Sequence, residues 1–425
     1  MPPHARKPAV GQTSVVTGTR DTTAYDVEAV RASFPALDGG TAFFDGPGGS
    51  QTPVAVADAV RDAMLAPMAN RGHVTAAARN SEAIVVACRA ALADLLGADP
   101  GEVIFGRSMT ALTFDLSRTL SAGWRPGDEI VVTRLDHDAN VRPWVIVAEA
   151  AGATVRWADF DPDTSELDVA AVAAQLTART RLVAVTAASN LIGTMPDVRA
   201  IAELAHEAGA LVFVDGVHYT AHGIVDVAEL GADFFACSPY KFLGPHCGVV
   251  VGRRDLLEEL RPAKLLPSTG QVPERFELGT LPYEVMAGAT AAVDFLAGLT
   301  PAIGSRRERL VTSLGALEAH EEHLRRRLEL GLADLTGVTV HSRALRRTPT
   351  LLLTFAAHDV ADVSVALAEH GINAPAGSFY AYEASRRLGL GDAGGLRIGL
   401  APYTTGDEVD RLLRSLADVV SASNT

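Results

Sequence analysis

The sequence predicts an α/β protein with a large domain built on a mostly parallel central sheet and a small C-terminal α+β domain. Between residues 103 and 251, short runs rich in Val, Ile and Phe alternate with helical patterns, as in sheets whose strands are joined by helices. These runs are continuously apolar, as burial on both faces of a sheet requires. After residue 300 a long charged helical pattern precedes a shorter series of strands and helices.

The order of elements suggests four parts. Residues 1–25 are rich in Thr, Pro and Gly without periodicity, so we expect a flexible N-terminal arm. We expect residues 26–47 to pack with the small domain and residues 48–299 to form the large domain. Residues 300–425 then supply a connector helix and the small domain.

The large domain is expected to begin with an amphipathic helix over 82–96, closed by Gly97. Further helices are predicted over 111–120, 170–176 and 198–208. The predicted strands are 103–105, 129–133, 154–157, 182–186, 211–214, 234–236 and 249–251.

Around 291–299 the pattern changes, and a helix rich in Arg, Glu and Leu is predicted over 304–332, with charge pairs four residues apart. The small domain is then expected to contain strands over 338–340, 350–355 and 397–400 and helices over 360–370 and 407–420.

Composition excludes several classes of protein. The 425 residues carry a net charge of −14 and no basic run, which argues against nucleic-acid or anionic-membrane partners. No segment approaches the roughly 20 apolar residues of a membrane span, and the first residues lack the apolar core of a signal peptide. The three cysteines are too few and too scattered for a disulfide framework or a zinc site. We therefore expect a cytoplasmic protein without a metal.

Two strand ends suggest amine chemistry. The sequence has only three lysines, Lys7, Lys241 and Lys264, and Lys241 follows a predicted strand. Asp215 ends another strand, 26 positions earlier. Pyridoxal phosphate needs such a pair, because the amine forms a Schiff base and the carboxylate keeps the pyridine nitrogen protonated. The alternative is a buried structural ion pair.

Other strand ends supply weaker signals. His137 follows the strand over 129–133 and could stack on a flat ring, although a lone histidine is more often structural. Residues 106–110 include small and hydroxyl-bearing side chains and open a helix. The free N–H groups there favour a phosphate, or the residues serve simply as a cap. Asn190 follows the strand over 182–186 and could hydrogen-bond a phenolic oxygen or a substrate.

The sequence resembles the cysteine-desulfurase-like enzymes of the class V aminotransferase group, which depend on pyridoxal phosphate and have fold type I. The resemblance covers residues 26–423 and rests on motifs in matching order and spacing. These motifs are FFDGPGGSQTP (43–53), LDHDAN (135–140), SNLIGT (189–194), VDGVH (214–218), SPYKFLGPHCG (238–248), FELGT (276–280) and LRIGL (396–400).

The resemblance implies a role for each matching residue. Lys241 would bind the cofactor and carry a proton between it and the substrate Cα, with His137 stacking on the ring and Asp215 at the pyridine nitrogen. Arg397 would clamp the substrate carboxylate. The remaining cofactor contacts would come from the phenolic-oxygen partners Asn190 and His218, from the phosphate-binding residues Met109, Thr110 and Ser238, and from Thr280 of a second subunit.

The sequence also departs from the desulfurase pattern. His218 stands where these enzymes usually have Gln, and Tyr240 where a His precedes the lysine. The loop over 374–381 lacks the sulfur-accepting cysteine and offers Ser378, which we expect to contact substrate. Free cysteines are usually buried small hydrophobes, and Cys88 lies on a predicted helix and Cys237 inside a predicted strand. Cys247, at the entry of a strand, is therefore the only plausible substitute.

These observations predict a pyridoxal-phosphate enzyme that acts on an L-amino acid, as a homodimer with shared active sites. The resemblance favours C–S bond cleavage by direct elimination. Transamination, epimerisation or a C–C bond reaction remains open, because the pocket selects the bond that breaks. A non-catalytic cofactor-binding sensor is a further alternative, and a nicotinamide enzyme is disfavoured because no G-x-G-x-x-G follows the first strand.

Overall fold

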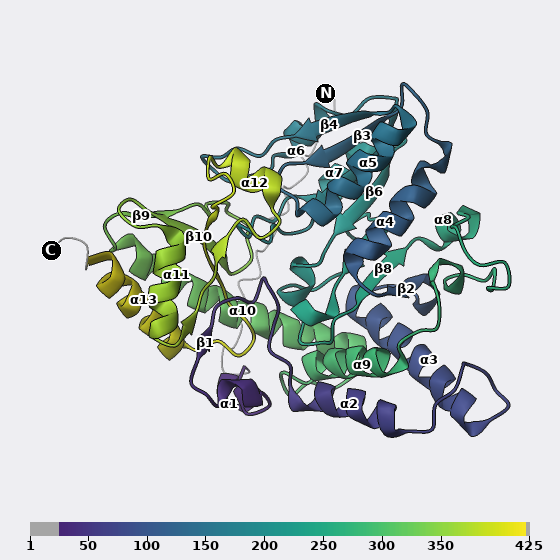
Figure 1. Ribbon diagram of the computed structural model, residues 1–425, viewed down its shortest axis with the longest axis horizontal. Coiled ribbons are helices and arrows are strands. Elements are labelled where there is room, and N and C mark those ends of the chain that lie inside the picture. The colour runs from purple at the N-terminus through teal and green to yellow at the C-terminus, as the bar shows by residue number, and fades with distance from the viewer. Residues whose placement is uncertain (1–24, 422–425) are drawn as a thin grey trace, which may run out of the picture.

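The computed structural model describes residues 25–421 and shows two lobes (Figure 1). The larger lobe contains a seven-stranded sheet between helices, and the smaller lobe contains a four-stranded sheet with helices α11 to α13. The predicted N-terminal arm lies outside the described residues except for Tyr25. The α/β architecture with a small second domain is therefore confirmed.

The central sheet is mostly parallel, as predicted. Its strand order is β2-β8-β7-β6-β5-β3-β4, and β8 alone runs antiparallel to its neighbours. Alternate strand residues enter the core on each face of the sheet, which explains the continuous apolar runs. The strands are β2 (Val103–Gly106), β3 (Glu129–Thr133), β4 (Thr154–Ala158), β5 (Thr180–Thr186), β6 (Leu211–Asp215), β7 (Phe234–Cys237) and β8 (Gly248–Gly252).

Helices cover both faces of this sheet. α4 (Met109–Leu120), α5 (Arg142–Ala151) and α8 (Arg254–Glu259) contribute to the core on one face. The core on the other face includes residues from α3 (Ala76–Leu96), α6 (Val169–Ala173), α7 (Val198–Glu207) and α9 (Tyr283–Ala297). α2 (Val54–Leu65) packs against α9.

The start of α3 is a correction to the predicted helix over 82–96. The helix begins six residues earlier, because the Thr75 side chain caps it by accepting a hydrogen bond from the Ala78 N–H at 3.1 Å. Six helices of the described residues were not predicted: α1, α2, α5, α8, α9 and α12. α9 is largely buried and rich in alanine, so its sequence lacks the polar face that marks an amphipathic helix.

The long connector helix is α10 (Arg306–Ala333), which begins with a capping box between Ser305 and Glu308. It packs against α3 and α9 of the large lobe and against α13 of the small lobe. The small sheet is antiparallel, with the order β12-β13-β10-β9. Its elements are β9 (Val338–Val340), β10 (Thr350–Phe355), α11 (Val360–Glu369), β12 (Ala376–Gly377), α12 (Tyr382–Arg387), β13 (Gly395–Gly399) and α13 (Gly406–Ser421).

The N-terminal segment joins the small lobe. After α1 (Val27–Arg31), strand β1 (Ala42–Phe43) pairs in parallel with β11 (Ile372–Asn373). Ala42 and Phe44 are buried in the core that also holds residues of β10, β13 and α13. This pairing brings Asp45, which follows Phe44 in the chain, beside Gly399 at the end of β13.

Within residues 25–421, no helix combines the length and the apolar character that crossing a membrane would need.

Candidate active site

A cavity lies at the carboxyl ends of the parallel strands, where ligands of open α/β sheets bind. It brings together eight of the eleven residues predicted to bind the cofactor or substrate or to act in catalysis. Arg397 contacts the lining residue Asn190, while Ser378 and Thr280 are not part of the lining. The lining residues are Ser108, Met109, Thr110, His137, Ala139, Thr186, Ala188, Asn190, Asp215, Val217, His218, Ser238, Tyr240 and Lys241.

Lys241 and Asp215 are both buried in this cavity. Lys241 lies on the turn after β7, and its Nζ donates a hydrogen bond to the Pro47 carbonyl. Burial and the nearby Arg397 lower the pKa of Lys241 to about 7, while Asp215 acts in the opposite direction. Burial raises the pKa of Asp215 to about 6, although its Oδ1 accepts a hydrogen bond from the Val217 N–H at 2.9 Å. Near neutral pH the site therefore holds a partly neutral, nucleophilic amine and a mostly ionised carboxylate.

The N-terminus of α4 forms one end of the cavity. Ser108 caps this helix, and Met109 and Thr110 begin it, so their N–H groups lie before the helical hydrogen-bond ladder. Gly248 allows β8 to approach closely, because a Cβ there would come within 2.1 Å of the Met109 nitrogen. Ser238 adds a hydroxyl from the end of β7. This is an arrangement suited to a phosphate group.

His137 is half-buried, and its Nδ1 accepts a hydrogen bond from the Ala139 N–H at 3.0 Å. Burial, Lys241 and Arg397 together lower the pKa of this imidazole to about 4. The ring is thus neutral at pH 7 with its proton on Nε2, which suits stacking on an aromatic ring.

Two buried polar atoms in the cavity lining test the fit of pyridoxal phosphate. Asn190 Oδ1 and His218 Nδ1 have no hydrogen-bond partner within the described part of the chain. A buried polar atom without a partner is costly, so each of them favours a polar ligand. Together with Lys241, Asp215 and the α4 N-terminus, they match the amine, pyridine nitrogen, phenolic oxygen and phosphate of this cofactor.

The Nε2 atom of His218 contacts residues of the small domain. It lies 2.9 Å from the hydroxyls of both Thr348 and Thr350. The His218 ring meets that of His222 edge to face at 4.8 Å, and His222 Nδ1 lies 2.9 Å from the Glu321 carboxylate on α10. Burial lowers the pKa of His218 well below its ordinary value, so this imidazole is neutral. The Thr contacts fix its ring orientation toward the cavity.

Arg397 lies on β13 and is fully enclosed, with 2% of its side chain exposed. Its Nη1 donates to the Asn190 carbonyl at 3.1 Å, and its guanidinium stacks on the Phe379 ring at 3.6 Å. Its Nη2 forms an ion pair with Asp45 at 2.6 Å. The predicted carboxylate clamp is therefore next to the cavity but already paired with a residue that sequence reasoning did not single out.

Two predicted site residues lie away from the cavity lining. Thr280 is exposed on the segment before α9, outside the cavity of its own chain. Ser378 is half-buried on the turn between β12 and α12. Hydrogen bonds join the next two residues to the site. The Phe379 carbonyl accepts one from Asn190 Nδ2 at 2.9 Å, and the Tyr380 carbonyl accepts one from the Asp138 N–H at 2.8 Å.

Sequence reasoning missed several residues of the site, among them Tyr240 as a lining residue, Asp45 and Asp136. Tyr240 stacks on His246 with ring centroids 4.8 Å apart. Asp136 is buried and hydrogen-bonded to Thr133 and Asn140, and burial raises its pKa to about 8. Its position beside His137 in the LDHDAN motif was the available signal, but a carboxylate is normally assumed to face solvent.

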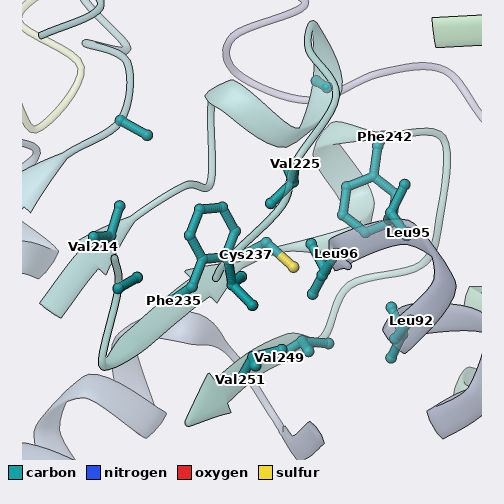
Figure 2. Packing of buried hydrophobic residues seen from close by; sticks show 14 of the residues in the cluster. Leu92, Leu95, Leu96, Val214, Val225, Phe235, Cys237, Phe242, Val249 and Val251 are labelled. Atoms are coloured by element: carbon teal, nitrogen blue, oxygen red, sulfur yellow. The ribbon is translucent and has the colours of Figure 1, made fainter. Parts of the chain in front are cut away.

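The three cysteines lie in the core, outside the cavity lining. Figure 2 shows Cys237 among apolar side chains that include Leu96, Val225 and Phe242. Burial raises the pKa of Cys88 to about 12 and raises those of Cys237 and Cys247 well above the ordinary thiol value. Cys247, the substitute considered for the missing loop cysteine, is thus a buried thiol that donates to the Pro245 carbonyl at 3.6 Å.

Comparison with known proteins agrees with this geometry. The aminotransferase class-V family model matches residues 42–412. An uncharacterized protein of Mycobacterium tuberculosis is 36% identical over 93% of this chain and 100% of its own length. A cysteine desulfurase of Dickeya dadantii is 32% identical over 92% of this chain and 96% of its own.

Solved structures agree as well. The crystal structure of the cysteine desulfurase CsdA from Escherichia coli is similar with a TM-score of 0.83 and 29% identity, over 93% of this chain and 98% of that one. The chain therefore belongs to the aminotransferase class-V family, as a fold-type-I, pyridoxal-phosphate-dependent enzyme of the cysteine-desulfurase-like group.

Proposed function

We propose that this protein cleaves the C–S bond of an L-amino acid by direct elimination, without forming a persulfide on the enzyme. The observation that carries the proposal is the placement of the thiols. A persulfide-forming desulfurase needs an accessible thiolate near the substrate sulfur, whereas Cys88, Cys237 and Cys247 are buried with raised pKa values.

The loop over 374–381 supports the same proposal. Ser378 offers a hydroxyl, a far weaker sulfur acceptor than a thiolate. Phe379 and Tyr380 both adopt the left-handed conformation, with φ of 52° and 58°, which costs on the order of 1 kcal/mol each. Hydrogen bonds to Asn190 and Asp138 hold this conformation. A loop fixed in this way is poorly suited to carrying sulfur out of the site.

Each residue then has a defined task. The bound cofactor supplies an electron sink for the electrons left at the substrate Cα. Lys241 would hold the cofactor and, through Nζ, take the Cα proton, which its pKa of about 7 permits at neutral pH. Asp215 would hold a proton at the pyridine nitrogen, while neutral His137 would cover one face of the ring. Ser108, Met109, Thr110 and Ser238 would bind the phosphate.

The bonds balance as an elimination. The Cα–H bond breaks with its proton going to Lys241 Nζ, and the Cβ–S bond breaks with its electron pair going to sulfur. The sulfur leaves as a thiol or as hydrogen sulfide after gaining a proton. Hydrolysis of the remaining fragment gives a 2-oxo acid and ammonia, so no oxidant or reductant is consumed.

We also propose a homodimer in the cytoplasm, in which Thr280 reaches the phosphate site of the second subunit. Leu278 and Thr280 are both exposed on the segment before α9 and do not line the active-site cavity of their own chain. This position suits a contact with a partner subunit. Light scattering gives the mass, and the Thr280→Ala variant is expected to bind the cofactor less tightly. A monomer with full cofactor affinity contradicts this assignment.

The decisive experiment is a screen of the purified holoprotein against amino acids and against thioether and sulfoxide conjugates of cysteine. The expected result is equal amounts of 2-oxo acid, ammonia and the released sulfur compound, which is a thiol or sulfide from a thioether or from cysteine and a sulfenic acid from a sulfoxide. Alanine together with a trapped enzyme persulfide would identify a desulfurase, and a 2-oxo acid without ammonia would identify a transaminase. Absence of turnover with all amino acids would favour a cofactor-binding module.

A further inference from the structure

A glycine-rich turn connects the two charged ends of the site. It begins at Asp45, whose carbonyl accepts from the N–H groups of Gly48 at 2.9 Å and Gly49 at 3.1 Å. The turn contributes two groups to the site: the Asp45 carboxylate, which pairs with Arg397, and the Pro47 carbonyl, which accepts from Lys241 Nζ. The segment over 45–49 therefore contacts both the substrate clamp and the catalytic amine.

The Arg397 guanidinium is only partly used. A guanidinium binds a carboxylate through two parallel N–H groups, for which the pair on one edge is Nε and Nη2. Asp45 Oδ1 accepts a hydrogen bond from Nη2 at 2.6 Å. Nε is buried and has no partner among residues 25–421. The binding edge for a carboxylate is thus half occupied, by a single oxygen of the protein itself.

We propose that Asp45 is a specificity-determining residue that competes with the substrate: its carboxylate occupies Arg397 in the free enzyme, and the substrate α-carboxylate replaces it to bind Nε and Nη2 together. This inference rests on the proposed function, in which Arg397 clamps an amino-acid carboxylate. The exchange replaces one ion pair by another, so Arg397 is never left as a buried unpaired charge, which would be costly.

The two partners differ in how firmly they are held. Arg397 is 2% exposed and is fixed by the Asn190 carbonyl and the Phe379 ring. The Asp45 side chain is 31% exposed, and within the described residues Arg397 is its one side-chain hydrogen-bond partner. Asp45 can therefore rotate into solvent while Arg397 stays in place.

The backbone of the turn does not have to move for this exchange. The Phe44 carbonyl accepts from the Gly399 N–H at 2.8 Å, and the Ser50 N–H donates to the Tyr240 carbonyl at 3.1 Å, so both ends of the turn are anchored. Gly48 packs directly on the Asp45 carboxylate, where a Cβ would come within 2.3 Å of Oδ2. A side-chain rotation of Asp45 is sufficient to free the clamp.

This competition makes an unusual prediction, because removing a charged residue of the site should tighten binding. Asp45→Asn keeps the size of the side chain but weakens its hold on the guanidinium. The amide oxygen of Asn can still accept a hydrogen bond from Nη2, so only the charge of the competing group is lost, and we expect the dissociation constant for L-alanine to fall about three- to tenfold. L-Alaninamide, which lacks the carboxylate, should bind both proteins equally.

The measurement is a titration of the holoprotein, followed by the change in the cofactor absorption spectrum. Calorimetry with propionate gives a second readout that does not depend on the reactivity of the cofactor. Asp45→Ser serves as a second variant in case Asp45→Asn disturbs the turn. Asp410→Asn is the matched control, because it removes one small-domain carboxylate that pairs with Arg327 on the surface.

Combination with Arg397→Ala separates the two hypotheses. If competition operates, Asp45→Asn tightens L-alanine binding only while Arg397 is present. If Arg397→Ala weakens binding but neither Asp45 variant tightens it, the competition is refuted and the clamp stands. If Arg397→Ala has no effect on L-alanine affinity, the clamp assignment itself is wrong and the inference falls with it.

Discussion

The lowered pKa of Lys241 makes a quantitative prediction about cofactor capture. An ordinary lysine has a pKa of 10.5, whereas that of Lys241 is about 7. At pH 7 about half of the Lys241 side chains are therefore neutral, against roughly one in 3,000 for an ordinary lysine. Because only the neutral amine attacks a carbonyl, Lys241 should capture pyridoxal phosphate efficiently at neutral pH.

The assay uses apoprotein mixed briefly with pyridoxal phosphate between pH 5 and pH 9, followed by borohydride and peptide mapping. Labelling of the peptide containing Lys241 should rise with pH and reach half of its maximal initial rate near pH 7. Lys264, which is exposed, serves as the internal control on the same chain. Its peptide should carry little label at pH 7.

Two variants test the physical cause. Arg397 lowers the pKa of Lys241 and Asp215 raises it. The midpoint should accordingly move to higher pH in Arg397→Ala and to lower pH in Asp215→Asn. A midpoint near pH 10 in the parent, label mainly on Lys264, or shifts in the opposite directions would refute this reasoning.

Three further predictions concern the clamp, the thiols and a buried acid. Arg397→Ala should retain the cofactor, seen by absorbance, while affinity for α-carboxylate substrates falls at least about tenfold, because a charge-assisted contact worth about 1.5–3 kcal/mol is lost; unchanged affinity would contradict it. Replacing Cys88, Cys237 and Cys247 together by Ala should leave turnover of the true substrate intact and lower only the thermal stability; loss of turnover in a folded, cofactor-loaded protein would revive a role for a thiol. Asp136, with a pKa raised to about 8 by burial, contributes stability that is present at low pH and lost as the pH rises to about 8. The free energy of unfolding of the Asp136→Asn apoprotein should therefore rise, relative to that of the parent, by about 1.4 kcal/mol per pH unit between roughly pH 4 and 8. Thermal unfolding that shows no such trend would count against this assignment.

The strands and the sheet type could be predicted from sequence because burial on both faces leaves a continuous apolar run. The inner strands of the central sheet carry this signal, whereas the edge strand β4 includes Arg156 and is mostly half-buried or exposed. The missed elements lack such a signal. α9 is buried and has no polar face, while β1, β11 and β12 have two residues each and exist only because a distant segment pairs with them.

The site was predictable where chemistry and strand ends coincide, as for Lys241 and Asp215. The LDHDAN and SNLIGT motifs supplied His137 and Asn190, which the fold brings into the same cavity. Contacts between segments far apart in the sequence were not predictable from residue types. The pairing of Asp45 with Arg397 joins positions 352 residues apart, and it depends on β1 joining the small lobe.

The same pairing bears on how Lys241 keeps its reactivity when substrate binds. Arg397 lowers the pKa of Lys241, and Asp45 raises it. If a ligand displaced Asp45 from Arg397 without bringing a negative charge of its own, the ammonium form of Lys241 would become still less favourable. A substrate α-carboxylate that takes the place of Asp45 restores a negative charge beside Arg397. On our proposal, the exchange therefore leaves the electrostatic field at Lys241 Nζ nearly unchanged, so that the amine stays ready to take the Cα proton near neutral pH. A ligand without a carboxylate would leave the ion pair between Asp45 and Arg397 intact and would gain no binding energy from Arg397.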